Sequence, residues 1–461
     1  MLTNTQASAK KNGYAVFSRN SLLFALFAVV IPNFLFLLTA PFYIASRLIS
    51  PFLYLAAGVA GLFLPARLTF LLFFAAAVVD LTLIVMIAFH LPLDVALNSL
   101  QYSASINPAA SLLYVFIAVI VTVTSALSAY LISRYRARLR EASLVPALLL
   151  AAALSCADLA WTQPYFRTPD VAFDSARVQT GMSADAVIGG GSNLLIVMVE
   201  GLGAFSDPEE GEALKSILTQ NLPQGRYEIE YGQTYYSGST TGAAARELCN
   251  RWGDYIDYLT GMPADDCLPN QLAAAGYETI AFHGFGTDMF QRDKWYPDIG
   301  FQKLEFLDQL EVEQPEHFAR RCGSVFNGLC DADVGEAVHA ALKAEPETPK
   351  FIYWLTLNSH IPFVKNEADP MACRSETPRI HNKTVCELSN LWSIVFEQVS
   401  EIAADPELAP TDILIVGDHH TPLWERAAKD GFELGKVDWI LLRHRDKHSG
   451  HPNRPPRPTT P

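Results

Sequence analysis

The first third of the chain contains long stretches that are almost free of charge. Between residues 21 and 91 only Arg47, Arg67 and Asp80 are charged, and residues 111–133 carry no charge at all. A helix needs about 20 apolar residues to cross the hydrocarbon core of a bilayer. We therefore expect five transmembrane helices, at roughly 20–40, 47–65, 68–91, 110–133 and 144–162. Because the second span is short and ends at a proline, four spans with a re-entrant segment are the alternative.

Basic residues fall on one side of these expected helices. Lys and Arg precede the first span, Arg67 lies between the second and third, and a cluster between the fourth and fifth consists of Arg134, Arg136, Arg138 and Arg140. The connection 92–109 has no Lys or Arg. Cytoplasmic loops carry an excess of these residues, so five spans leave the rest of the chain outside the cytoplasm. A cleavable signal peptide is not expected, because the apolar region extends far beyond one short segment.

The remainder of the chain is acidic. Up to residue 142 there are 9 Lys and Arg against 3 Asp and Glu, and beyond it there are 25 against 45, a formal charge of −20. This balance excludes a basic nucleic-acid-binding protein, and an apolar content of 50% excludes a disordered chain. We expect a transmembrane anchor at 1–162, a linker at 163–190, a catalytic domain at 191–447 and a disordered tail at 448–461 rich in Pro and Arg.

The cysteines agree with this topology. Cys156 lies in the fifth expected span, and the other six follow it. An even number beyond the membrane suits an oxidising compartment. Their clustering along the chain favours disulfides between neighbours, namely Cys249–Cys267, Cys322–Cys330 and Cys373–Cys386. A zinc ribbon is disfavoured because the sequence has no CxxC pair.

Apolar runs alternate with helical segments after residue 190. Strands are expected at 193–199, 279–282, 351–357, 412–416 and 437–442, and helices at 208–220, 242–250, 268–275, 333–343 and 387–404. Such alternation predicts an α/β domain with a mostly parallel sheet covered by helices on both faces.

Four of these runs are followed by side chains that can bind a metal or act in catalysis. They are Glu200, His283, His360, and the pair Asp418 and His419. Ligands of open α/β sheets bind beyond the carboxyl ends of the strands, so we expect these side chains to form one site. Carboxylates and imidazoles suit zinc or manganese, and three protein ligands leave a coordination position open.

The segment 238–242, GSTTG, leads directly into helix-forming residues. Its hydroxyl groups should therefore lie at a helix N-terminus, where free backbone N–H groups favour a phosphate. Ser and Thr at such a position usually only cap the helix. A nearby metal would change this, because a cation stabilises the alkoxide that an alcohol needs to become a nucleophile.

The order of these motifs resembles the membrane-bound, sulfatase-like branch of the alkaline phosphatase superfamily. This branch includes lipoteichoic acid synthases, phosphoethanolamine transferases and the phosphoglycerol transferases of periplasmic glucans. The matching motifs are Glu200 after a strand, Thr240 in GSTTG, His283-Gly284 followed by Arg292-Asp293, His360 in NSHIPF, and Gly417-Asp418-His419. The resemblance covers nearly the whole chain and implies an alkaline-phosphatase-like α/β domain behind five N-terminal spans.

The resemblance also implies a role for each residue. The positions that match the family's metal ligands are Glu200, Thr240, Asp418 and His419, and Thr240 also matches the nucleophile that becomes phosphorylated. Those that match its contacts to the substrate phosphate or headgroup are His283, Arg292 and His360. Thr241 stays open as the alternative nucleophile.

Two positions qualify this resemblance. Phe290 stands where the lipoteichoic acid synthases have a Trp, which argues against their glycerol phosphate headgroup. True sulfatases modify a Cys or Ser in a C-x-P-x-R motif, whereas the nearest match, 267–271, ends in Gln. Hydrolysis of sulfate esters is therefore disfavoured. His420 is expected to lie outside the ligand set.

The resemblance therefore implies a zinc- or manganese-dependent transferase of the bacterial inner membrane with a periplasmic catalytic domain. It would move phosphoethanolamine or phosphoglycerol from a phospholipid donor, through phospho-Thr240, to an envelope glycan or lipid acceptor. No nucleic-acid partner is expected. The alternatives are a phosphoester hydrolase with the same site, which uses water as the acceptor, and a non-catalytic membrane scaffold.

Overall fold

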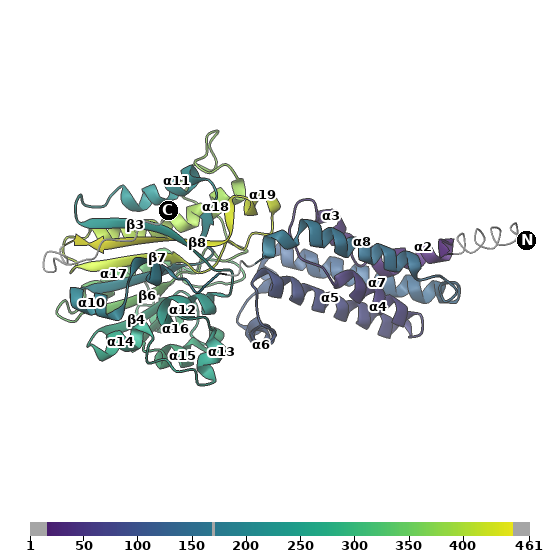
Figure 1. The fold of residues 1–461 in the computed structure, drawn as a ribbon, viewed down its shortest axis with the longest axis horizontal. Coiled ribbons are helices and arrows are strands. Elements are labelled where there is room, and N and C mark those ends of the chain that lie inside the picture. The colour runs from purple at the N-terminus through teal and green to yellow at the C-terminus, as the bar shows by residue number, and fades with distance from the viewer. Residues whose placement is uncertain (1–15, 168–170, 446–461) are drawn as a thin grey trace, which may run out of the picture. The chain divides into compact units, whose positions relative to one another are not determined.

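The computed structural model describes residues 16–167 and 171–445, which form two compact units (Figure 1). The helical unit comprises residues 16–96, 108–167 and 424–426. The α/β unit comprises residues 97–107, 171–423 and 427–445. The tail expected at 448–461 lies outside the described residues. Each unit is described by itself.

The helical unit is built from apolar helices. In chain order they are α2 (Arg19–Ala25), the π-helix η1 (Leu26–Val30), α3 (Phe34–Thr39), α4 (Ser50–Gly61), α5 (Ala66–Ala88), η3 (Pro108–Ala110), α7 (Leu112–Leu139), α8 (Val145–Trp161) and η4 (Gln163–Phe166). Among the described residues, α5 and α7 are the two helices long and apolar enough to cross a membrane, with mean hydropathies of 2.7 and 2.3. Three further apolar helices, Arg19–Val30, Ser50–Gly61 and Val145–Trp161, are shorter. Five complete spans therefore stay a prediction.

One buried ion pair lies inside the helical unit. The carboxylate of Asp80 on α5 is fully buried and accepts hydrogen bonds from Nε of Arg47 and from the hydroxyl of Tyr54, at 3.1 Å and 3.0 Å. The hydroxyl of Ser50 donates to the same carboxylate. Because a buried charge without partners is costly, these contacts explain how an acidic residue is accommodated within an apolar helix.

The α/β unit contains one mixed sheet. Its strands are β1 (Asn193–Val199), β2 (Gly203–Phe205), β3 (Tyr227–Tyr235), β4 (Glu278–His283), β5 (Lys303–Phe306), β6 (Lys350–Leu355), β7 (Thr411–Gly417) and β8 (Phe432–His444). The strand order is β2-β8-β7-β1-β6-β4-β5, and β3 also pairs with β8. The five strands β7-β1-β6-β4-β5 are parallel, whereas β8 runs antiparallel to β7, β2 and β3.

The remaining helices precede or connect these strands along the chain. They are α6 (Leu93–Ser99, at the boundary between the units), η2 (Leu100–Ala104), α9 (Ala176–Thr180), α10 (Ala184–Gly190), α11 (Pro208–Thr219), α12 (Thr240–Cys249), α13 (Tyr255–Leu259), α14 (Leu268–Ala274), η5 (Met289–Gln291), α15 (Arg292–Asp298), α16 (Leu307–Glu313), α17 (Asp331–Lys343), α18 (Lys383–Ala404) and α19 (Arg426–Lys429). The helices α11, α17 and α18 share one apolar cluster with Leu195, Val197 and Val199 of β1, which point to the same face of the sheet. Helices on this face agree with part of the covering that the alternation predicted.

The core lies where these helices meet the central strands. The strands β1, β6 and β7 are buried along their whole length. Their side chains share one apolar cluster with α11, α17 and α18, in which Trp354 and Trp392 are fully buried. Because β1 lies between β7 and β6, the residues that follow these strands meet at one edge of a rigid layer.

Three disulfides cross-link the α/β unit. They join Cys249 to Cys267, Cys322 to Cys330 and Cys373 to Cys386, which are the neighbour pairs expected from the sequence. The first ties the end of α12 to the start of α14. The third ties the loop after β6 to the first turn of α18. Cys156 on α8 is a free thiol.

Candidate metal centre and active site

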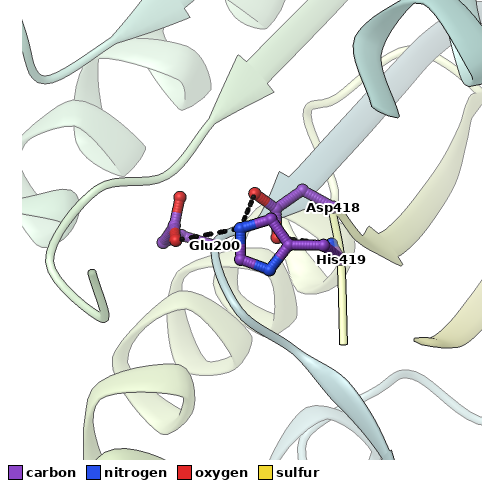
Figure 2. Close-up of side chains that lie close together, drawn as sticks. All are labelled: Glu200, Asp418 and His419. Carbon is purple, nitrogen blue, oxygen red and sulfur yellow. Dashed lines mark hydrogen bonds and ion pairs between the residues drawn. The ribbon is translucent and has the colours of Figure 1, made fainter. Parts of the chain in front are cut away.

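Glu200, Asp418 and His419 form a cluster at the carboxyl end of the sheet (Figure 2). Glu200 follows β1, and the other two follow β7, its parallel neighbour, in which Gly417 is aligned with Val199. Nε2 of His419 lies 3.5 Å from Oε1 of Glu200 and 3.3 Å from Oδ2 of Asp418. All three side chains are buried, and their ligand atoms lie within 4.8 Å of one another.

The electrostatics of this cluster favour a cation. Burial, and next the charge of Asp418, raise the pKa of Glu200 well above its usual value. Two buried carboxylates this close repel each other, and a divalent cation between them would remove that repulsion. The donor set of two carboxylates and one imidazole fits zinc or manganese.

The imidazole of His419 is oriented for such a role. Its Nδ1 lies 3.1 Å from the backbone oxygen of His420. A carbonyl oxygen only accepts, so Nδ1 carries the proton in the neutral ring and Nε2, which faces the two carboxylates, is left with its lone pair. The adjacent His420 is not part of this cluster. Its Nε2 lies 3.1 Å from Nζ of Lys429, whose pKa is lowered to about 8 by burial.

The two candidate nucleophiles have different partners. The hydroxyl of Thr240, the first residue of α12, donates to Oδ2 of Asp418 at 2.7 Å. The hydroxyl of Thr241 is buried and donates to Oδ1 of Asp254 at 2.8 Å. Ser239 acts as the N-cap, accepting from the backbone N–H of Gly242 at 3.0 Å. Of the two threonines, Thr240 is therefore the one whose hydroxyl points at Glu200, Asp418 and His419, the candidate metal-binding residues that we call the metal cluster.

Two histidines lie at the ends of neighbouring strands. His283 ends β4, and burial together with the charge of Arg292 lowers its pKa to about 3. His360 follows β6, and burial together with the charge of His419 lowers its pKa to about 4. Both rings are therefore neutral near pH 7. Nδ1 of His283 donates to the backbone oxygen of Leu355 and that of His360 to the oxygen of Ile361, each at 2.9 Å, so both rings keep Nε2 as an acceptor.

Arg292 supplies a buried positive charge. Its side chain is 3% exposed at the start of α15, and its Nη1 donates to the backbone oxygen of Met289 at 3.3 Å. Within the described residues its Nε has no hydrogen-bond partner. A buried guanidinium with an unused donor is suited to an anionic ligand such as a phosphate. Its charge partly offsets the rise in the pKa of Glu200 and contributes to the lowered pKa of His283, so it acts on the same site.

The backbone before Arg292 adopts an uncommon conformation. Phe290 and Gln291 are consecutive non-glycine residues with φ of 56° and 51°. Phe290 packs against Tyr102 and Tyr255, with ring centroids 5.1 Å and 5.6 Å apart. Nε2 of Gln291 donates to the hydroxyl of Tyr102 at 3.3 Å. These contacts hold the turn that carries Arg292 to the site.

Sequence reasoning missed several of these supporting residues. Tyr102 lies far upstream, in the connection 92–109, and nothing in its local sequence signals the contact with Gln291. Trp392 and Ser359 donate to the backbone oxygen of Glu200, at 3.1 Å and 2.7 Å. Asp254 holds the hydroxyls of Ser239 and Thr241. Such contacts join distant segments, so only the folded chain reveals them.

Comparisons with known proteins identify a family for this chain. The Sulfatase family model matches residues 192–439. No curated protein matches the sequence. Solved structures resemble it at low identity. The lipoteichoic acid synthase LtaP from Listeria monocytogenes has 16% identity and a TM-score of 0.39, over 55% of this chain and 66% of that one. The Streptococcus pyogenes phosphoglycerol transferase GacH, in complex with sn-glycerol-1-phosphate, has 15% identity and a TM-score of 0.40, over 56% of this chain and 71% of that one.

A third structure is the C-terminal periplasmic domain of EcEptC from Escherichia coli in complex with Zn, with 14% identity, a TM-score of 0.37, and coverage of 57% of this chain and 76% of that one. This chain spans slightly less than two thirds of the length of the Listeria protein. The family match covers more than half of the chain and includes Glu200, Thr240, Asp418 and His419. The protein therefore belongs to the sulfatase family, within the alkaline phosphatase superfamily.

Proposed function

We propose that this protein is a membrane-bound, metal-dependent phosphotransferase. It moves the phosphoethanolamine or phosphoglycerol headgroup of a phospholipid to a hydroxyl group of an envelope glycan or lipid, through a phosphodiester on Thr240. The observation that carries this proposal is the 2.7 Å hydrogen bond from Thr240 to Asp418, beside Glu200 and His419. A hydroxyl held against a cluster suited to a cation is the arrangement that an activated alcohol nucleophile requires.

Zinc or manganese would be held by Glu200, Asp418, His419 and Thr240. When bound, such an ion stabilises an alkoxide and neutralises charge on phosphoryl oxygens. Asp418 fixes the direction of the Thr240 hydroxyl, which lies at the positively polarised N-terminus of α12. Glu200, Asp418 and His419 follow the ends of two adjacent parallel strands, so the site needs little reorganisation during the reaction.

Arg292, His283 and His360 complete the mechanism. In the first step the oxygen of Thr240 attacks the phosphorus, the bond to the diacylglycerol oxygen breaks, and the proton of the Thr240 hydroxyl ends on that leaving oxygen. The guanidinium of Arg292 binds the phosphoryl oxygens, whose charge increases in the transition state. In the second step the incoming hydroxyl oxygen attacks the phosphorus and the bond to Oγ1 of Thr240 breaks. A neutral imidazole accepts the proton of that hydroxyl at Nε2 and passes it to Oγ1. His283 and His360 are both suited to this role, since Nδ1 of each ring already donates to a backbone oxygen.

A lipid donor agrees with the rest of the chain. The helices α5 and α7 could hold the protein in the membrane in which such a donor resides. Three disulfides suit an oxidising compartment outside the cytoplasm. We therefore propose the inner membrane as the location, with the α/β unit on its periplasmic side.

The test is to incubate the purified protein with phospholipid and to find the modified residue by mass spectrometry. The proposal expects the headgroup phosphate on Thr240, and a loss of this adduct in Thr240→Ala and after chelation of metal. A Thr240→Ala variant with full transfer activity would overturn it. Adding a glycan separates transferase from hydrolase, because a transferase forms a glycan product whereas a hydrolase releases the headgroup to water. A protein that binds no metal and forms no adduct would be a scaffold.

A further inference from the structure

The α/β unit contains a cavity of about 540 Å³ between the loop after β6 and the start of α18. Its ionisable lining residues are Lys365, Arg374, His381, Lys383 and Glu387. None of them belongs to the proposed catalytic set. The disulfide Cys373–Cys386 also lines the cavity and ties its two walls together.

The cavity concentrates positive charge in an acidic domain. Two lysines and one arginine face a single carboxylate, that of Glu387. Within the described residues the amino group of Lys383 has no hydrogen-bond or ion-pair partner, and it sits on the first turn of α18. Arg374 donates to the backbone oxygens of Asn366 and Glu367, at 2.7 Å and 3.0 Å, which fixes the loop around the cavity. The lining therefore favours an anionic group.

Glu387 adds a second, independent requirement. Its side chain is only 3% exposed, and Oε1 accepts from Nζ of Lys365 at 3.0 Å. Within the described part of the chain, Oε2 is buried and has no hydrogen-bond partner. A buried carboxylate oxygen without a donor is costly, and a ligand hydroxyl would supply that donor. A molecule that satisfies this cavity therefore carries both an anionic group and a hydroxyl group.

His381 is not free to turn into the cavity as a second base. Its Nδ1 lies 2.9 Å from Oε1 of Glu210, which also accepts from the backbone N–H of His381. The imidazole is therefore held against α11 and forms one wall. Glu210 keeps its negative charge behind this imidazole, whereas Lys383 and Arg374 themselves line the cavity.

Two covalent connections limit how far the cavity lies from the metal cluster. Lys365 is five residues from His360, so their Cα atoms are at most about 18 Å apart. On α18, Glu387 is five residues from Trp392, a rise of about 7.5 Å, and Nε1 of Trp392 donates to the backbone oxygen of Glu200 at 3.1 Å. A glycan that binds in the cavity can therefore extend to the site.

We propose that this cavity is the acceptor subsite, and that the acceptor is a hydroxyl-rich molecule with phosphate or carboxylate groups, such as an anionic glycan. This inference rests on the proposed phospho-Thr240 intermediate. A hydroxyl oxygen of the bound acceptor attacks the phosphorus, and the bond between phosphorus and Oγ1 of Thr240 breaks. The proton of that hydroxyl ends on Oγ1, so the enzyme is regenerated. The cavity favours this acceptor over water by binding it near the intermediate.

The test measures two products in parallel with the full-length protein in detergent. The donor is a phospholipid with a labelled headgroup, and the acceptor probe is glucose 6-phosphate, with glucose as its uncharged match. The variants are Lys383→Gln and Glu387→Gln, and the control is Lys303→Gln, an exposed lysine on β5 outside the cavity. We expect both cavity variants to transfer at least about tenfold less headgroup to glucose 6-phosphate, while release to water changes less than about twofold. Glucose should be the poorer acceptor.

Unchanged transfer in both cavity variants would overturn the inference, and so would an equal loss of transfer and hydrolysis. Equilibrium binding of glucose 6-phosphate to Thr240→Ala protein provides a separate measurement that needs no chemistry. The dissociation constant should rise at least about tenfold when Lys383→Gln is added. A missing adduct on Thr240 would refute the proposed function, whereas unchanged binding in the Lys383→Gln protein would refute the acceptor subsite.

Discussion

At the scale of single residues, the neighbouring threonines at the start of α12 differ in what their hydroxyls contact. Thr240 donates to Asp418 in the metal cluster, whereas Thr241 donates to Asp254 and is buried. Thr240→Ala should lower transfer by at least about 10³-fold, because the attacking oxygen is lost. Thr241→Ala should retain the phospho-adduct and lose about 1 kcal/mol of stability from one hydrogen bond. Adduct mass spectrometry and denaturant unfolding measure the two effects.

The opposite result is equally informative. An adduct that persists in Thr240→Ala and disappears in Thr241→Ala would assign the nucleophile to Thr241. Thr240→Ser serves as the matched control, since it keeps a hydroxyl at the same position and should keep part of the activity.

Asp438 provides a pH-dependent prediction away from the metal cluster. Burial raises its pKa to about 6, partly offset by Lys215 and by the hydrogen bond from Nε2 of Gln233 at 3.2 Å. The folded protein therefore holds this proton more tightly than the unfolded chain does. The resulting stabilisation is complete below a pH of about 4 and is lost as the pH rises through about 6. At pH 8 the charged carboxylate costs up to about 3 kcal/mol relative to a neutral group.

Asp438→Asn should therefore stabilise the protein at pH 8 and change little at pH 4. Chemical unfolding of both proteins at the two pH values measures the difference. The prediction is wrong if the variant is equally stable as the parent at pH 8, or if its advantage is larger at pH 4.

At the scale of elements, the segment 97–107 contributes a side chain to the site although it precedes the catalytic sequence by a long distance. Tyr102 accepts from Gln291 and packs against Phe290, directly before Arg292. Tyr102→Ala should loosen this turn and raise KM for the lipid donor about tenfold, with a smaller effect on kcat. Tyr102→Phe keeps the ring and loses only the 3.3 Å hydrogen bond, so its KM should rise less than about threefold.

Steady-state kinetics with varied donor concentration separates these cases. A fall in kcat with unchanged KM in Tyr102→Ala would show that Tyr102 does not position the donor site. Tyr231, a half-exposed residue of β3 outside the site, offers the control Tyr231→Ala, which should leave both constants unchanged.

The sequence predicted those elements whose apolar pattern is continuous. β1, β6 and β7 are buried on both faces, so their runs of apolar residues are visible in the sequence. The polar residues that follow β1 and β7 are those that the structure brings together as Glu200, Asp418 and His419. β3 was missed because most of its residues are half-buried or exposed, so it has no continuous apolar run, and β5 because it has only four residues. The antiparallel direction of β8 was also not predicted, since an apolar run carries no information on direction. Two short helices, α9 and α10, lie within the segment predicted as a linker.

At the scale of the whole molecule, the charge pattern and the apolar helices make a joint prediction of topology. The cluster of arginines at 134–140 ends α7, and α8 is the last apolar helix before the α/β unit. If α8 crosses the membrane, its start is cytoplasmic and its end is periplasmic. With 17 residues α8 is at the short limit for a span, so this crossing needs a direct test.

Alkaline phosphatase reporters fused after residues 140 and 167 provide that test, because the reporter is active only outside the cytoplasm. We expect no activity after residue 140 and full activity after residue 167. Activity at both positions, or at neither, would mean that α8 does not cross. In the second case the α/β unit would be cytoplasmic, where its three disulfides would be reduced and where envelope acceptors are absent. The fusion after residue 167 therefore tests the membrane side on which the proposed transfer takes place.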